Sequence, residues 1–257
     1  MFRTGTLTRG AVSVAGNQTW LGTISTAQEH FIRAYVKVLP ETQFVAESVC
    51  AWLLHKLDVP TPEAFWVQVH KHILPDFPSW RRGEKSRICF ASRELPAQSL
   101  WRETKRDPSA LMNLEKWEHT LPAGIFDELV VNEDREPKNI LTDGRNNYWL
   151  IDHNHAFGSD QWTPEWLRGN AFPNFSNKLL EVLSRMTPGQ RIKFGKDTPA
   201  HCTSLAKLLK VLPLRDVSDD SRTRNAVDWF LSKRVEHLVE MTKFRLGLGE
   251  LDLQSRP

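Results

Sequence analysis

The stretch from residue 132 to residue 152 constrains the fold of this chain more than any other segment. Two turn-forming pairs, Asp143-Gly144 and Asn146-Asn147, separate two short apolar runs, which is the pattern of a β-hairpin. We expect this hairpin to be centred between residues 145 and 146, so that Asn139 and Asp152 face each other at its open end. Two oxygen-bearing side chains would then lie side by side on a stiff ribbon.

This arrangement of oxygen atoms suits a magnesium ion, which prefers one or two protein oxygens and completes its coordination with substrate phosphates. Asp134 lies five residues before Asn139, on the loop that enters the hairpin. The catalytic loop of protein kinases has this spacing between its base and a metal-binding Asn, and a second metal-binding Asp follows after a hairpin. The order Asp134, Asn139, Asp152 therefore predicts phosphoryl transfer. In the alternative, Asp134 and Asn139 are turn residues that bond the local backbone.

A second pair of residues, near the start of the chain, favours the same interpretation. Lys37 lies near the end of a predicted strand over residues 31–39, and a helix is expected over residues 42–57. Glu47 falls on the apolar face of this helix, where a carboxylate is costly unless a cation meets it. Lys37 is the candidate, because kinases pair a strand lysine with a helix glutamate. In the alternative, Lys37 extends to solvent and Glu47 lies at the edge of the apolar stripe.

The remaining pattern predicts an α+β protein whose N-terminal third is rich in strands and whose remainder is mainly helical. Strands are expected over residues 11–14, 19–24, 31–39, 63–69 and 87–90. Helices are expected over residues 42–57, 107–119, 123–131, 176–186, 200–211 and 222–246. The last two strands are separated by a basic loop that either meets an acidic partner or is simply solvated, with Arg81, Arg82, Lys85 and Arg87.

Composition and charge narrow the class of protein. The 257 residues fit one large domain or two lobes, and 40% hydrophobic residues are ordinary for a folded protein. Lys and Arg number 34 against 31 Asp and Glu, and a net charge of +3 does not by itself predict a nucleic-acid partner. No apolar run approaches the length of a membrane span, about 20 residues, and no secretory signal is visible. Three cysteines without metal-like spacing favour a reduced, cytoplasmic protein.

Together these features resemble the HipA-like kinases, bacterial serine/threonine kinases with the two-lobed fold of protein kinases and phosphoinositide kinases. The resemblance covers roughly residues 10–158 and rests on the Lys37 strand and on residues 44–47, 57–63, 126–135 and 150–153. It implies an N-lobe of residues 1–90, with a small antiparallel sheet and one helix, and a mainly helical C-lobe of residues 91–257. ATP and Mg²⁺ would bind in the cleft between these lobes.

The resemblance also implies a role for each residue of the predicted site. Lys37 would hold the nucleotide phosphates, and Glu47 would orient Lys37. Asp134 would accept the proton of the substrate hydroxyl. Asn139 and Asp152 would bind Mg²⁺.

Two further segments would contact the nucleotide. Residues 88–92, which include Phe90 and Ser92, resemble the hinge whose backbone reads adenine. The turn Gly16-Asn17-Gln18-Thr19 would cover the phosphates. Lys138 would either steady the transferred phosphoryl group or extend into solvent.

The sequence departs from the kinase pattern at several positions. It has no G-x-G-x-x-G motif, and Glu136 stands where HipA-like kinases often have histidine. His153-Asn154 replaces the Phe-Gly that follows the metal-binding Asp of ordinary kinases. These departures leave regulation and substrate docking open.

The resemblance implies transfer of the γ-phosphoryl group of ATP to a Ser or Thr hydroxyl of a cytosolic protein, in a toxin-like role with an antitoxin as a candidate partner. Three alternatives stay open. The same fold could phosphorylate a small molecule or a lipid, or it could be a pseudokinase that binds ATP and acts as an interaction protein. Retention of all five key residues argues against a pseudokinase. Residues 152–155, Asp-His-Asn-His, could hold a nuclease metal, but His70 and His72 lie too far upstream to complete such a site.

Overall fold

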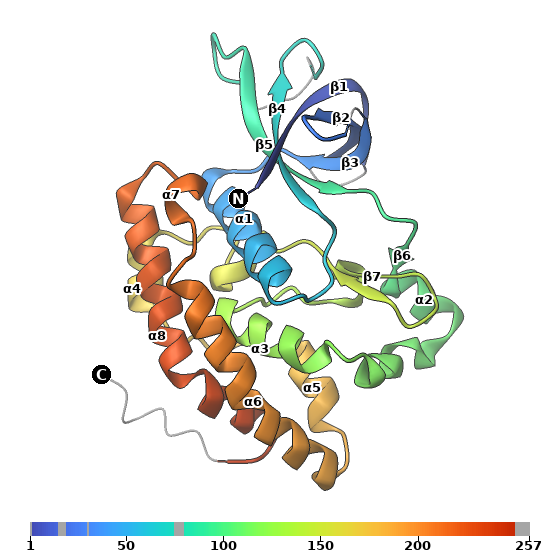
Figure 1. Ribbon diagram of the computed structural model, residues 1–257, viewed down its shortest axis with the longest axis vertical. Helices are drawn as coiled ribbons and strands as arrows, with labels where there is room; N and C mark the ends of the chain where they lie inside the picture. The colour runs from blue at the N-terminus through green and yellow to red at the C-terminus, as the bar shows by residue number, and fades with distance from the viewer. Residues whose placement is uncertain (1, 15–18, 30, 75–79, 250–257) are drawn as a thin grey trace.

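Five strands near the N-terminus close into a small barrel (Figure 1). The computed structural model describes residues 2–14, 19–29, 31–74 and 80–249. The order of the strands around the barrel is β1-β2-β3-β5-β4. Their bounds are β1 (Arg3–Val14), β2 (Thr19–Thr26), β3 (Ile32–Lys37), β4 (Ala64–His70) and β5 (Ser86–Arg93). Inward-facing side chains such as Ile24, Val36 and Phe65 form the apolar core of the barrel.

The expectation of a purely antiparallel sheet is wrong at one pair of strands. The first residues of β1, Arg3 to Thr6, pair in parallel with β4, and the later ones pair antiparallel with β2. β1 therefore begins at Arg3 instead of residue 11. Residues 3–8 are rich in threonine and contain one apolar residue, Leu7, so an apolar pattern could not reveal this strand. Threonine nevertheless favours strands because its branched side chain fits a pleated surface.

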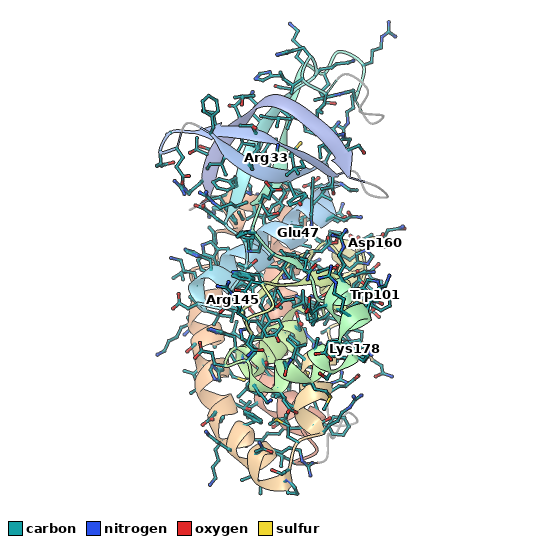
Figure 2. The ribbon with its side chains drawn as sticks, turned by 90° about the vertical axis from the view of Figure 1, so that its right-hand side faces the viewer. Arg33, Glu47, Trp101, Arg145, Asp160 and Lys178 are labelled. Atoms are coloured by element: carbon teal, nitrogen blue, oxygen red, sulfur yellow. The ribbon has the colours of Figure 1, made fainter. Side chains whose placement is uncertain are left out.

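The helix between β3 and β4, α1 (Glu41–Lys56), lies between the barrel and the other helices, as Figure 2 shows through the place of Glu47. All residues from Val45 to Leu54 are buried. The prediction of a single apolar face therefore describes only part of the buried surface of α1. A helix that is covered on all sides shows little amphipathic pattern. At the start of α1, the hydroxyl of Ser218 donates a hydrogen bond to Glu41 Oε1 at 3.0 Å.

The rest of the described chain is mainly helical. Its helices are α2 (Leu100–Arg106), α3 (Thr120–Val130), α4 (Pro164–Gly169), α5 (Lys178–Ser184), α6 (Pro188–Leu209), α7 (Leu214–Val217) and α8 (Ser221–Arg245). Short 3-10 segments are η1 (Pro108–Lys116), η2 (Pro137–Asn139) and η3 (Ala156–Gly158), and a small sheet joins β6 (Gln98–Ser99), β7 (Ile140–Thr142) and β8 (Tyr148–Leu150). Within the described residues, none of the helices has the length and apolar character that crossing a membrane requires.

Two helices differ from the sequence-based expectation. The helix expected over residues 107–119 is the 3-10 segment η1, although Asp107 does cap it, accepting a hydrogen bond from the Ser109 amide at 2.9 Å. α6 begins at Pro188 instead of residue 200, because Thr187 and Gln190 form a capping box. Proline is expected to end a helix, but Pro199 lies inside α6.

The helix α3 is central to the helical part and is held closely by α5 and α8. A Cβ on Gly124 would lie 2.7 Å from Leu180 Cδ2, so the absence of a side chain there lets α5 approach α3. From α8, the buried Arg234 donates a hydrogen bond from Nε to the carbonyl of Leu129 at 2.8 Å, near the end of α3. Val131 then adopts a left-handed conformation with φ 53°, which turns the chain out of the helix.

The β7–β8 hairpin is present, but its register differs from the prediction. Ile140 pairs with Leu150, so Asn139 is opposite Ile151 and accepts a hydrogen bond from its amide at 3.1 Å. The turn comprises residues 143–147, an odd number, whereas facing Asn139 and Asp152 required an even one. Asp152 follows the strand with a left-handed φ of 61°. Regular strand alternation would place the side chain of Asp152 on the face of the hairpin opposite to that of Asn139, and this local bend changes its direction.

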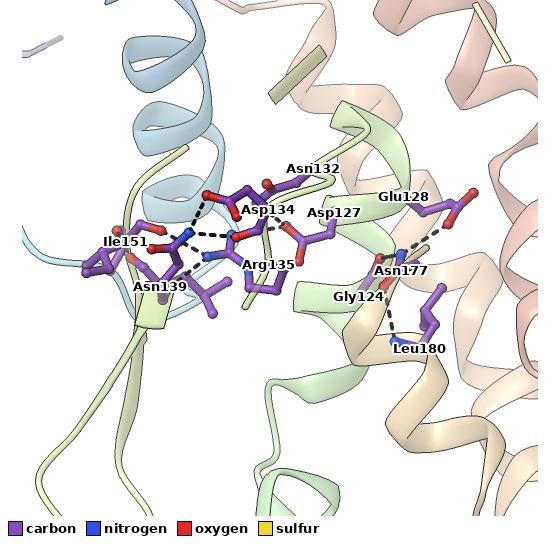
Figure 3. Close-up of polar contacts among 12 residues, drawn as sticks. Gly124, Asp127, Glu128, Asn132, Asp134, Arg135, Asn139, Ile151, Asn177 and Leu180 are labelled. Carbon is purple, nitrogen blue, oxygen red and sulfur yellow. Dashed lines mark hydrogen bonds and ion pairs between the residues drawn. The ribbon is translucent and has the colours of Figure 1, made fainter. Parts of the chain in front are cut away.

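A buried ion pair joins α3 to the loop that precedes the hairpin (Figure 3). Arg135 donates to both carboxylate oxygens of Asp127, from Nε at 3.0 Å and from Nη2 at 3.1 Å. Its Nη1 donates to the carbonyls of Asn139 and Ile151, both at 3.0 Å. One guanidinium therefore fixes the helix, the loop and both sides of the hairpin. The motif that contains Arg135 and Asp127 could be seen in the sequence, but their pairing could not.

We predict that Arg135→Met lowers the free energy of unfolding by about 3–5 kcal/mol, because it leaves the carboxylate of Asp127 buried without a cation. The double variant Arg135→Met/Asp127→Leu should recover part of this loss, since the buried charge is gone while two carbonyls still lack their donor. Urea unfolding of both variants measures this. A single variant as stable as the wild type would contradict the structural role of the pair.

Candidate active site

A cavity of about 320 Å³ lies between the barrel and the helical part. The barrel contributes Thr19, Tyr35, Lys37, Phe90 and Ser92 to its walls. The opposite wall includes Lys138, Leu141, Ile151, Asp152 and His153. Predicted site residues that lie far apart in the sequence, such as Lys37 and Asp152, therefore line the same cavity.

Lys37 is the central charge of this cavity. Its ammonium group forms ion pairs with Glu47 Oε1, on α1, and with Asp152 Oδ1 at 2.8 Å, just after the hairpin. The side chain of Lys37 is 13% exposed and that of Glu47 is 2% exposed. The structure thus brings Lys37 and Glu47 together, and the alternative in which Lys37 extends to solvent is wrong.

Burial and charge act against each other at this pair. Burial by itself lowers the pKa of Lys37, but the carboxylates of Glu47 and Asp152 outweigh it, so the pKa is raised. Burial by itself raises the pKa of Glu47, but the ammonium of Lys37, together with His153, outweighs it and lowers that pKa to about 2. Both groups are therefore charged at neutral pH, and each depends on the other for it.

Asp134 and Asn139 form a second cluster, on the loop fixed by Arg135 (Figure 3). The amide nitrogen of Asn139 donates to the backbone carbonyl of Asp134 at 2.6 Å and to its Oδ2 at 2.9 Å. The ammonium of Lys138 lies 3.2 Å from Asp134 Oδ1 and 3.2 Å from Glu136 Oε2. The two carboxylates outweigh the effect of burial and raise the pKa of Lys138, which lines the cavity as a cation.

The donor atoms of Asn139 and Asp152 fit a hard divalent cation. Because the amide nitrogen of Asn139 is bonded to Asp134, its carbonyl oxygen is the atom left to act as a ligand. One amide oxygen and one carboxylate suit Mg²⁺, which takes its remaining ligands from phosphates and water. The described residues contain no group of three or more His, Cys, Asp and Glu side chains that could hold a metal by themselves.

His153, which departs from the kinase pattern and belongs to the candidate nuclease motif, lies against Glu47. Its Nδ1 is 3.6 Å from Glu47 Oε2, and its ring meets Phe126 edge-on at 5.9 Å. Burial lowers the pKa of His153, although Glu47 opposes this, so the ring is neutral at pH 7. The imidazole faces Glu47 and Phe126, which gives the nuclease interpretation of residues 152–155 no support.

The predicted hinge over residues 88–92 is misplaced. These residues lie inside β5, where Phe90 pairs with both Lys37 of β3 and Trp66 of β4. The backbone groups of residues 90–92 are therefore used within the barrel on both sides, although Phe90 and Ser92 do line the cavity. The connection to the helical part is made by residues 94–97, which the sequence analysis missed. Leu95 and Ala97 of this connection also line the cavity.

The predicted phosphate-covering turn is described only at its end. Gly16, Asn17 and Gln18 lie outside the described residues. Thr19 begins β2, pairs with Lys37 and lines the cavity. The contact between the turn and a nucleotide stays a prediction.

Comparison with known proteins places these residues in a family. A sequence model of HipA-like kinases matches residues 16–242. No curated protein matches the chain. Among solved structures, the crystal structure of a Helicobacter pylori proinflammatory kinase, CtkA, superposes with a TM-score of 0.57 at 10% identity, over 89% of this chain and 94% of that chain.

The structural likeness supports the fold alone, a mixed α+β arrangement with a sheet-containing N-terminal part and a helical C-terminal part. The family match goes further, because it spans nearly the whole chain and includes every residue of the cavity wall from Thr19 to His153. This protein belongs to the HipA-like kinase family.

Proposed function

We propose that the protein is a Mg-ATP-dependent kinase that transfers the γ-phosphoryl group to a Ser or Thr hydroxyl of a cytosolic protein. The observation that carries the proposal is the ion-paired group Lys37, Glu47 and Asp152 in the cavity wall, which brings together β3, α1 and the end of the hairpin. In this proposal residues 1–90 form the N-lobe and residues 91–257 the C-lobe of a two-lobed kinase.

The cavity offers distinct surroundings for the two ends of ATP. Phe90 and Leu95 supply an apolar region for adenine, next to the backbone of residues 94–97. Lys37 supplies a fixed cation for the phosphates, and Glu47 holds its ammonium in place. Asn139 and Asp152 would hold Mg²⁺, which neutralises phosphate charge when it is bound.

The transfer step needs a base beside the acceptor hydroxyl, and Asp134 is the carboxylate on the loop that precedes the hairpin. The hydroxyl oxygen forms a bond to the γ-phosphorus while the bond from that phosphorus to the bridging oxygen of ADP breaks. The hydroxyl proton passes to the carboxylate of Asp134. Lys138, 3.2 Å from Asp134 Oδ1, supplies positive charge beside the transferred group. Positioning and charge neutralisation supply most of the rate enhancement in such a site.

Family membership supports a protein acceptor, and we extend the proposal to a toxin-like role in which phosphorylation slows growth and an antitoxin binds the kinase. Incubating the purified protein with Mg²⁺, γ-labelled ATP and a cytosolic extract tests this. Label on a protein band would identify the substrate. Stabilisation by Mg-ATP without labelled protein would favour a small-molecule or lipid kinase, or a pseudokinase.

We predict that Asp134→Asn and Asp152→Asn each lower the rate of phosphoryl transfer by about 10²–10⁴-fold, because they remove the proton acceptor and a phosphate-metal ligand. Asp143→Asn is a matched control on the turn of the same hairpin, where the carboxylate accepts hydrogen bonds from the Arg145 amide and from Asn147. It should keep wild-type activity. Normal transfer in either folded site variant would exclude this mechanism.

A pH experiment tests the coupling of Lys37 and Glu47 without an activity assay. In the wild type the pKa of Glu47 is lowered to about 2, so the pair stabilises the fold above the ordinary pKa of 4.5, and this stability is lost as pH falls toward 2. In Lys37→Met, burial, the largest influence on this group, is opposed only by His153, and we expect the pKa of Glu47 to rise above its ordinary value. The sign therefore reverses, and this variant should lose stability as pH rises through the raised pKa.

Urea unfolding across the acid-to-neutral range measures this reversal. Lys207→Met, at an exposed position on α6, is the matched control and should follow the wild-type profile. A Lys37→Met protein with the pH profile of the wild type would show that the pair is not energetically coupled.

A further inference from the structure

The hairpin formed by β4 and β5 extends beyond the barrel, on the side away from the helices (Figure 1). β4 pairs with β5 along its whole length, from Ser86 to Ser92. β3 pairs only with the last part of β5, from Phe90 to Arg93. The first part of β5, residues 86–89, is therefore bonded by a strand on one side only among the described residues.

The hydrogen-bond pattern shows which backbone groups point to the open side. The Lys71 amide donates to the Lys85 carbonyl at 2.9 Å, and the Arg93 amide donates to the Glu63 carbonyl at 2.9 Å. Odd-numbered residues of β5 therefore bond toward β4, and even-numbered residues point the other way. Phe90 uses this direction to pair with β3, but within the described residues no backbone partner bonds Ile88 there.

The side chain of Ile88 is also open to solvent, with 53% of its surface exposed. An apolar, β-branched residue in the middle of an unpaired edge is the arrangement that accepts an added strand. Natural edges are often protected by charged side chains or proline, but residues 87–89, Arg-Ile-Cys, place an isoleucine at the centre of this one.

The described residues of the loop beside this edge carry an excess of positive charge. Four exposed cations, Lys71, Arg81, Arg82 and Lys85, form no ion pair with any described residue. The nearby carboxylate of Glu84 is paired with Arg87, which donates to both of its oxygens, each at 2.7 Å. It also accepts a hydrogen bond from the Arg81 amide at 2.8 Å, but it forms no ion pair with any of the four cations. The pairing with Arg87 lowers the pKa of Glu84 to about 2.

The cationic loop is anchored to the barrel by Trp80. The indole nitrogen of Trp80 donates to the Leu74 carbonyl at 2.7 Å, and the guanidinium of Arg87 lies 5.6 Å from the centre of its ring. Ile73 and Trp80 pack against the apolar core of the barrel. The charges are therefore presented on a fixed support, which lowers the entropy cost of binding a partner.

We propose that the open edge of β5 at residues 86–89, with the cations Lys71, Arg81, Arg82 and Lys85, is the docking surface for an extended acidic segment of a partner protein. This segment would add a strand beside Ile88, with its carboxylates toward the cationic loop. A peptide is favoured over nucleic acid because the edge offers backbone hydrogen bonds and an apolar side chain, whereas a phosphate backbone would use the cations alone. The proposal does not depend on the kinase activity.

The test uses a fluorescein-labelled peptide of alternating Glu and Val, of about six residues, the usual strand length. The same peptide with Lys in place of Glu and a short DNA duplex are compared probes, and fluorescence anisotropy of the full chain reports binding. We expect the Glu-Val peptide to bind and the variant Arg81→Glu/Arg82→Glu to weaken binding by about tenfold or more. Binding should also protect the Ile88 amide from hydrogen exchange.

Two substitutions test the contribution of the strand edge to binding separately from that of the cations. Ile88→Pro removes the outward N–H and the apolar side chain at an edge position that tolerates proline, and it should abolish binding. Ile88→Val keeps both features and should bind as the wild type does. Circular dichroism melting checks that each variant is folded.

Four outcomes would overturn the proposal. The Lys-Val peptide could bind as well as the Glu-Val peptide, or Ile88→Pro could leave binding unchanged. DNA that binds more tightly through the same arginines would make the surface a polyanion site. Self-association that Ile88→Pro abolishes, measured by light scattering, would make a second copy of this chain the occupant.

Discussion

One largely covered ammonium group, that of Lys37, holds together three parts of the chain that come from different regions of the sequence. It ion-pairs with Glu47 on α1 and with Asp152 after the hairpin, while its own strand belongs to the barrel. A charge in such a place is costly to bury and is stable only with its partners in position. Displacing the barrel, α1 or the hairpin would leave one of these charges unpaired. The relative positions of the three elements therefore depend on the ion pairs in the cavity.

Two buried guanidinium groups likewise join separate segments of the chain, in the helical part of the protein. Arg135 joins Asp127 of α3 to the carbonyls of Asn139 and Ile151, and Arg234 of α8 bonds the end of the same helix. A planar guanidinium presents several donors in fixed directions, so it suits the joining of carbonyls from separate segments. The loop with Asp134 thus has a rigid base although it has little regular structure of its own, which is how catalytic loops combine exposure with precision.

Much of the candidate site could be predicted from the sequence, because its residue types recur at a characteristic spacing along the chain. The spacing of Asp134, Asn139 and Asp152 survives without knowledge of the fold, and Glu47 on an apolar stripe demands a cation such as Lys37. The pairing of Arg135 could not be foreseen, since a buried arginine and a loop arginine look alike in a sequence. The parallel β1–β4 contact was hidden by a threonine-rich strand, and the hairpin register depended on one residue in the turn. The predicted hinge was placed too early in the chain, because residues 88–92 look like a connector in the sequence. Only their pairing with β3 and β4 shows that they belong to a strand.

The burial of α1 has a consequence for how such a protein can be switched. Apolar side chains such as Val49 and Leu53 are fully covered, and swinging the helix outward would expose them at about 1.5–3 kcal/mol each. That total exceeds the few kcal/mol that separate the two states of a typical conformational switch. A switch that moved α1 outward would therefore have to unfold part of its surroundings as well.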